Sequence, residues 1–203
     1  MTQSKIIGIT GTIGSGKTAA AHIMQSLGAY VINADIVARE VLLPESEASK
    51  LIHKQFGDDV MLMGTDIVDR KKLARRVFSD NEAREALNAI TLPIIKREMY
   101  AKADIAKRIY GHKVIVFDAP LLIEAGLHEG LDDIWLIKCS NDTKLRRIMQ
   151  RDNLSRDEAQ ARIDTRMSDE EFARYATVII ENDASYSDLR DKVTEQYTAR
   201  YIR

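Results

Sequence analysis

Five short apolar runs recur along the chain and predict five buried β-strands. They lie at Lys5–Thr10, Tyr30–Ile32, Val114–Phe117, Ile134–Ile137 and Val178–Ile180. Each run is rich in β-branched residues and lacks alternating polar positions, which is typical of strands covered on both faces of a parallel sheet. We therefore expect an α/β protein with a three-layer core built on a five-stranded parallel sheet.

A helical pattern connects the first two runs. Apolar residues recur at helical spacing at Ala20, Ile23, Met24 and Leu27. Gly28 follows directly and is expected to end this helix. A strand, a loop, a helix and a second strand in this order form a right-handed βαβ unit, from which a parallel sheet grows. A closing helix is expected after the last strand, at Ser187–Tyr197.

Two connections between the predicted strands are too long for simple crossovers. Residues 35–111 have a helical pattern throughout, including a helix that Pro93 is expected to open, and residues 141–175 form a charged helical stretch. A long helical insertion in a compact α/β domain usually holds a substrate or closes over one. We therefore divide the chain into a helical substrate-binding domain (35–111), a lid (141–175) and a core (1–34, 112–140 and 176–203).

The composition describes an ordinary globular protein. Of the 203 residues, 45% are hydrophobic and 30% are charged, and the formal net charge is −1, so no global positive field attracts nucleic acid. No apolar stretch approaches the roughly 20 residues that a membrane helix needs. Cys139 is the only cysteine, which excludes an intrachain disulfide and fits a reducing, cytoplasmic location.

The stretch GTIGSGKT between the first strand and the first helix matches G-x-x-x-x-G-K-[ST], the phosphate-binding loop or P-loop. Glycines allow successive main-chain N–H groups to point inward around phosphate oxygens, and the helix start adds further unpaired N–H groups. The residues expected to bind the phosphates of a nucleoside triphosphate are Gly11, Thr12, Ile13, Gly14, Ser15, Gly16, Lys17 and Thr18. The alternative is a glycine-rich turn with a solvated lysine.

Two oxygen-bearing side chains of the same region are candidates for a Mg²⁺ site. The Thr18 hydroxyl follows the P-loop lysine, and Asp118 follows the third predicted strand at the carboxyl edge of the sheet. An aspartate at this position can hold Mg²⁺ through water, as a Walker-B aspartate does. The alternative for Asp118 is a helix cap or a turn.

A second carboxylate, Asp35, follows the second predicted strand at the same edge. There it could accept the proton of an attacking hydroxyl, or it could cap the next helix. The chain has no N-K-x-D stretch for reading guanine, which weakens a GTPase interpretation. These features favour a phosphotransferase.

The predicted lid is rich in arginine. Its members are Arg146, Arg147, Arg151, Arg156, Arg162, Arg166 and Arg174. Most are expected to be solvated and paired with interspersed acids, but one or two could close over a triphosphate and bind its oxygens with the guanidinium fork. A basic surface for nucleic acid is the competing interpretation.

The motifs together resemble those of dephospho-coenzyme A kinases. GTIGSGKT, NADIVARE, FGDDV, VDRKKLARRVF, FDAPLLIEAGL and RDNLSRDEAQARI follow in the family's order, and the resemblance extends from Ile6 to Asn182. It implies a P-loop core with a helical coenzyme-A domain and an arginine-bearing lid. The implied reaction moves the γ-phosphoryl group of ATP, with Mg²⁺, to the ribose 3′-hydroxyl of dephospho-coenzyme A.

The resemblance also implies roles for individual residues. Lys17 and Thr18 would serve ATP and Mg²⁺, and Asp35 would be the catalytic base. The acceptor would be held or shaped by Arg39, Leu121, Leu122 and Glu124. Arg147 and Arg151 would be the catalytic lid arginines. The expected partners are ATP and dephospho-coenzyme A, without nucleic acid or membrane, and the expected state is a monomer or a small homo-oligomer.

The chain departs from the family pattern at several positions. Thr12 replaces a glycine, Asn33 an aspartate and Leu92 a histidine; Lys144 and Arg166 stand for lid glutamines, and Thr177 for an aspartate. Two alternatives therefore remain open. One is a P-loop kinase of another small hydroxyl acceptor, such as a nucleoside or nucleotide. The other is a nucleotide-binding regulator that has lost acceptor chemistry.

Overall fold

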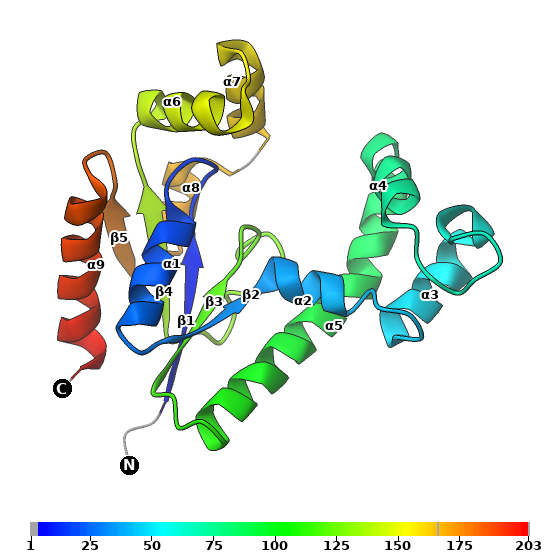
Figure 1. Ribbon diagram of the computed structural model, residues 1–203, viewed down its shortest axis with the longest axis horizontal. Coiled ribbons are helices and arrows are strands. Elements are labelled where there is room, and N and C mark those ends of the chain that lie inside the picture. The colour runs from blue at the N-terminus through cyan, green and yellow to red at the C-terminus, as the bar shows by residue number, and fades with distance from the viewer. Residues whose placement is uncertain (1–3, 166, 203) are drawn as a thin grey trace. The chain divides into compact units, whose positions relative to one another are not determined.

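A five-stranded parallel sheet forms the centre of the fold in the computed structural model, which describes residues 4–165 and 167–202 (Figure 1). The strands are β1 (Lys5–Thr10), β2 (Tyr30–Asn33), β3 (Val114–Asp118), β4 (Asp133–Lys138) and β5 (Val178–Glu181). Their order across the sheet is β2-β3-β1-β4-β5. All five predicted strands and the α/β class are thus confirmed, with bounds that shift by a residue or two.

The P-loop leaves the sheet from its middle strand. In β1, Ile9 is in register with Asp118 of β3 and with Trp135 of β4, and both pairings are parallel. Strand order reverses beside β1, and ligands of open α/β sheets bind outside the carboxyl ends of strands at such a point. The register therefore brings Asp118 to the edge from which the P-loop starts.

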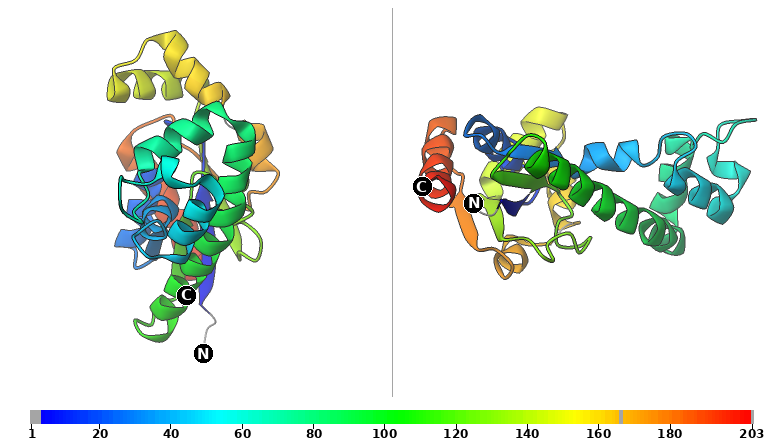
Figure 2. Two further views of the ribbon diagram at one scale, coloured as in Figure 1. Left: turned by 90° about the vertical axis from the view of Figure 1, so that its right-hand side faces the viewer. Right: turned by 90° about the horizontal axis from the view of Figure 1, so that it is seen from below.

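Two helices, α1 (Lys17–Ser26) and α9 (Tyr186–Tyr201), cover one face of the sheet (Figures 1 and 2). Side chains of both helices share a buried cluster with β1, β3, β4 and β5, and Trp135 is fully buried in it. The Trp135 Nε1–H donates to the Tyr201 hydroxyl at 3.1 Å, and that hydroxyl donates to Asp133 at 2.7 Å. These bonds hold the end of the closing helix, which was predicted to be shorter.

The chain forms two compact units. One comprises the chain up to Ile32 and from Ala103 onwards, and the other, the helical unit, is Asn33–Lys102. The helical unit contains α2 (Ala34–Glu40), α3 (Glu47–Phe56), the 3₁₀ turn η1 (Asp58–Val60), α4 (Arg70–Ser79) and most of α5 (Asn81–Arg108). It has a core of its own, formed by Ile52, Val60, Met61, Val68 and Leu73.

Pro93 does not open a helix, so this prediction was wrong. It lies inside the 28-residue helix α5, which begins at Asn81. A proline removes one main-chain donor and crowds the preceding turn. The residues before it, NEAREALNAI, are mostly good helix formers, and they continue the helix through this single interruption.

Three helices make up the lid segment, which we define as α6 (Asn141–Asp152), α7 (Arg156–Asp164) and α8 (Asp169–Ala173). α6 and α7 lie side by side (Figures 1 and 2). They share a small core of Leu145, Ile148 and Ala159, against which Ile13 of the P-loop packs. Within residues 4–165 and 167–202, no helix combines the length and the apolar character needed to span a bilayer.

Candidate active site

The P-loop has the backbone shape of a phosphate-binding nest. Gly14 and Gly16 have φ values of 80° and 94°, in the left-handed region that L side chains rarely adopt. Gly16 is also crowded, because a Cβ there would lie 2.2 Å from Nδ2 of Asn182. That amide nitrogen donates to the Ser15 carbonyl at 2.7 Å and so holds the loop from outside. Glycine at position 16 therefore serves both the turn and this contact.

Gly16→Ala is expected to destabilise the protein more than Gly28→Ala. The two glycines have nearly the same φ, 94° and 97°, but a Cβ at Gly28 meets nothing within 4 Å. Gly28→Ala should therefore cost only the strain of a left-handed alanine, about 1 to 2 kcal/mol. Gly16→Ala should add a packing cost of about 1 to 3 kcal/mol. Urea unfolding of both variants measures the difference, and equal losses would contradict the role of the Asn182 contact.

Lys17, the first residue of α1, forms an ion pair with Asp118 at the end of β3. The side chains are 12% and 4% exposed, so the pair is largely withdrawn from water. A buried charge is tolerated only beside a partner, and the pair fixes the ammonium at the start of the helix. Lys17 thus stands at the point where the P-loop passes into α1.

Oxygen donors that suit Mg²⁺ lie at this same edge. Thr18 is exposed in the first turn of α1, and the Asp118 carboxylate is buried at the end of β3. In the described part of the chain, no group of three or more His, Cys, Asp or Glu side chains could hold a metal ion by itself. Mg²⁺ commonly binds through one or two side chains together with waters and substrate phosphates, and a hydroxyl with one carboxylate fits that pattern.

Arg147 of α6 contacts the main chain of the P-loop. Its Nη1 donates to the carbonyls of Gly14 and Ser15 at 3.2 and 3.4 Å, and its Nη2 donates to the carbonyl of Asn182 at 3.0 Å. These bonds satisfy three main-chain carbonyls, two of which belong to the P-loop. Arg147 therefore supports the shape of the nest in this structure.

Cys139 lies next to this arginine. Its Sγ is 3.7 Å from Nη1 of Arg147, and the residue is buried. Burial raises the pKa of the Cys139 thiol, since desolvation outweighs the nearby positive charges. The thiol is thus a small packed group and a poor nucleophile at neutral pH.

Arg151, one helical turn after Arg147, points to solvent. Its guanidinium binds both oxygens of Asp152, at 2.8 and 2.9 Å, and the hydrogen bond from this carboxylate raises the pKa of Arg151 above its ordinary value. Arg162 contacts the same carboxylate at 2.7 Å. Exposed pairs of this kind exchange partners at little cost. Arg166, another predicted lid arginine, lies outside the described residues.

In the helical unit, the first turn of α2 carries Asp35. The side chain of Asn33 fills the N-cap position and accepts from the Ile36 N–H at 3.1 Å. Capping is therefore supplied by Asn33, and the Asp35 carboxylate is exposed. Arg39 lies in the last turn of the same helix and is also exposed. The two side chains are four residues apart and so share one side of α2.

Replacing the cap tests whether it holds α2. Asn33→Ala should destabilise the protein by about 1 kcal/mol, whereas Asn33→Asp should keep most of the stability, because aspartate caps as well as asparagine. Circular dichroism melts of both variants make this comparison. A larger loss for Asn33→Asp than for Asn33→Ala would contradict the capping role.

The residues after β3 divide between surface and core. Leu121 is 42% exposed and Glu124 is exposed, so both can meet a ligand. Leu122 is fully buried, and its Cδ2 would lie only 2.5 Å from a Cβ placed on Gly8. Leu122 therefore packs beneath this loop against β1, and it can shape a binding surface only from below.

Two functional candidates were missed from the sequence. Asp169, at the start of α8, accepts from the Thr12 hydroxyl at 3.0 Å and from Lys144 at 2.6 Å. Asn182 after β5 bonds the P-loop as described above. The motif Ser168-x-x-Glu171 marks the start of α8, where both reciprocal bonds of a capping box form. This motif does not indicate, however, that Asp169, the residue after Ser168, faces the P-loop.

Comparisons with known proteins cover nearly the whole chain. Residues 5–188 match the family model described as dephospho-CoA kinase. A dephospho-CoA kinase of Geobacter sulfurreducens is 39% identical over 197 residues, which is 97% of this chain and 98% of the relative. Among solved structures, the protein TT1252 from Thermus thermophilus is 31% identical, with a TM-score of 0.80 and 98% of each chain covered. The dephospho-CoA kinase from Campylobacter jejuni is also 31% identical, with a TM-score of 0.72 and 95% of each chain covered.

Proposed function

This chain belongs to the dephospho-CoA kinase family, and we propose the residues with which it transfers the γ-phosphoryl group of ATP to the ribose 3′-hydroxyl of dephospho-CoA. This reaction is the final step of coenzyme A biosynthesis. One observation carries the assignment of the site. The left-handed glycines Gly14 and Gly16 directly precede Lys17, and Lys17 pairs with the buried Asp118 at the carboxyl edge of the sheet.

The P-loop would hold the triphosphate of ATP. Phosphoryl transfer depends mainly on positioning and on stabilising negative charge, since the reacting group passes through a largely dissociative transition state. The inward N–H groups of Gly11–Thr18 would bind phosphate oxygens, and the Lys17 ammonium would neutralise the β- and γ-phosphates. The exposed Arg151 would leave Asp152 and add a fork of donors from the lid segment.

Thr18 would bind Mg²⁺ through its hydroxyl, and Asp118 would bind it through water. When bound, the ion supplies positive charge to the phosphate oxygens. Asp118 would at the same time keep its contact with Lys17, so that the two positive charges are arranged around one carboxylate.

For the acceptor, the family resemblance favours residues of the helical unit and of the loop after β3. Asp35 would position the 3′-hydroxyl and accept its proton. Its carboxylate is exposed and is not needed to cap α2, because Asn33 supplies that cap. Arg39, on the same side of α2, would hold the acceptor's negative groups. Leu121 and Glu124 would line the acceptor surface, with Leu122 supporting them.

We further propose that the enzyme acts in the cytoplasm, with ATP and dephospho-CoA as its partners. The single cysteine is a buried free thiol, which fits a reducing compartment.

The test is a transfer assay with a panel of acceptors. Purified protein is incubated with ATP and Mg²⁺ and with dephospho-CoA, adenosine or AMP, and product mass and ADP release are followed. We expect dephospho-CoA to gain one phosphate and the other acceptors to react far more slowly. Preference for adenosine or AMP would favour a kinase of another acceptor. Tight ATP binding without transfer to any acceptor would favour a regulator.

A further inference from the structure

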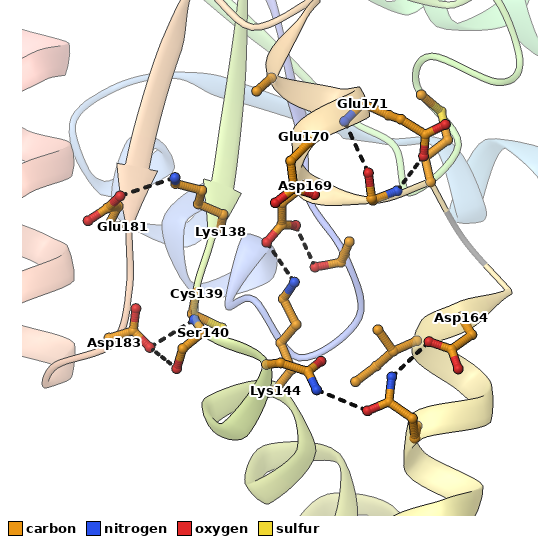
Figure 3. Close-up of a pocket in the computed structure, with 17 residues that line it drawn as sticks. Lys138, Cys139, Ser140, Lys144, Asp164, Asp169, Glu170, Glu171, Glu181 and Asp183 are labelled. Atoms are coloured by element: carbon orange, nitrogen blue, oxygen red, sulfur yellow. Dashed lines mark hydrogen bonds and ion pairs between the residues drawn. The ribbon is translucent and has the colours of Figure 1, made fainter.

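A single carboxylate joins the P-loop to the lid segment. Oδ1 of Asp169 accepts from the Thr12 hydroxyl at 3.0 Å, and Oδ2 accepts from the Lys144 ammonium at 2.6 Å (Figure 3). The three residues come from the P-loop, from α6 and from the first turn of α8. Asp169 therefore contacts the P-loop and α6 at the same time.

The Lys144–Asp169 pair is well shielded from water. The two side chains are 8% and 13% exposed, so water screens neither charge well. They lie at the wall of a cavity of about 770 Å³ between the ends of β4 and β5 and the lid segment. Further carboxylates line this cavity, at Asp164, Glu170, Glu171, Glu181 and Asp183 (Figure 3). The surroundings are therefore acidic, and Lys144 supplies positive charge where it offsets Asp169.

The position of Asp169 creates an electrostatic problem for a nucleotide site. Its carboxylate is one hydrogen bond away from a residue of the P-loop, and an uncompensated negative charge there would repel a triphosphate. We propose that Lys144 is a positioning residue for ATP binding. Its ammonium neutralises Asp169, so that this carboxylate can fasten Thr12 to the lid segment without weakening the affinity of the P-loop for phosphate.

Two other contacts fasten the same loop to the lid segment. Ile13 packs against the small core of α6 and α7, and Arg147 bonds the Gly14 and Ser15 carbonyls. Neither contact carries a net negative charge toward the loop. Of these three contacts, the one through Asp169 needs a compensating cation, and that cation is Lys144.

The experiment compares Lys144→Gln, Asp169→Asn and the double variant. This inference rests on the proposed nucleotide site, so the readout is the ATP dissociation constant measured by calorimetry, with KM for ATP and kcat measured separately. Lys144→Gln should weaken ATP binding by about tenfold, as expected for one uncompensated like charge near the phosphates. Asp169→Asn should leave the affinity unchanged or raise it. The double variant should recover most of the loss of Lys144→Gln.

Lys138→Gln is the matched control. It removes an ammonium from the same cavity, but Lys138 pairs with Glu181 at 3.1 Å and is 34% exposed. Its ATP affinity should stay within about twofold of the unaltered protein, because an exposed pair contributes little. Thermal melts of every variant report the structural cost of each change independently.

The two single variants are expected to change the ATP affinity differently: Lys144→Gln lowers it, and Asp169→Asn does not. This difference separates a role in nucleotide binding from a merely structural one. If Lys144→Gln and Asp169→Asn weaken ATP binding equally, and the double variant shows no recovery, the bridge only holds the fold together and the inference is overturned. Unchanged affinity in Lys144→Gln would overturn it as well. Absence of ATP binding to the unaltered protein would instead overturn the proposed function, and this inference with it.

Discussion

Lys17→Ala is expected to lower kcat/KM for phosphoryl transfer by about a thousandfold or more, the range seen when a preorganised charge-stabilising donor is removed from an active site. The ammonium is held at the start of α1 by its pair with Asp118, and in the proposed function it would neutralise the β- and γ-phosphates from there. Alanine removes this charge from the P-loop. The assay is the conversion of dephospho-CoA to coenzyme A at saturating Mg²⁺.

The same variant would also leave Asp118 buried without this cation, which can destabilise a protein by about 3 to 5 kcal/mol. The double variant Lys17→Ala/Asp118→Asn separates the two effects. It should recover much of the lost stability, since the buried carboxylate is gone, but none of the lost turnover. A double variant that regains near-normal activity would show that the ammonium does not serve the phosphates.

Asp35→Asn is expected to lower kcat by about 10²- to 10⁴-fold, the usual contribution of a positioned general base. KM for ATP should change little, because the carboxylate is assigned to the acceptor hydroxyl. Steady-state kinetics with each substrate varied in turn give both values. Asparagine has nearly the same shape, and Asn33 already supplies the cap of α2, so the melting temperature should stay close to that of the unaltered protein.

Glu40→Gln is the control for this variant. Glu40 is an exposed carboxylate at the other end of α2, paired with Lys102 at 2.9 Å. It should keep nearly full activity, since it has no assigned role. Near-normal kcat in Asp35→Asn would refute the base assignment, and an equal loss in Glu40→Gln would point to a general effect of charge on this helix.

The parts of the fold that follow from local patterns could be predicted. Buried strands can be recognised as short β-branched runs. The P-loop has its glycines and lysine in one continuous stretch, so both features were found without tertiary information. The start of α5 could not be found in this way. Pro93 is a strong local signal for a helix start, yet a helix can accept one lost bond when its other residues favour it.

Contacts between distant segments could not be predicted either. The arginine content of the lid suggested phosphate binding, but nothing in the sequence tells that Arg147 faces main-chain carbonyls while Arg151 faces solvent. Asp169 is likewise one acid among many until the fold brings it to Thr12, which is 157 positions away along the chain. Such contacts depend on how the helices pack. The type of a residue alone does not reveal which distant residue it will contact.

The packing of Ile13 into the core of α6 and α7 has a consequence for protein engineering and for divergence within the family. A substitution at Leu145, Ile148 or Ala159 that opens a void or adds bulk would disturb the support of Ile13, although these residues lie in α6 and α7. Changes in this small core should therefore be designed together with position 13.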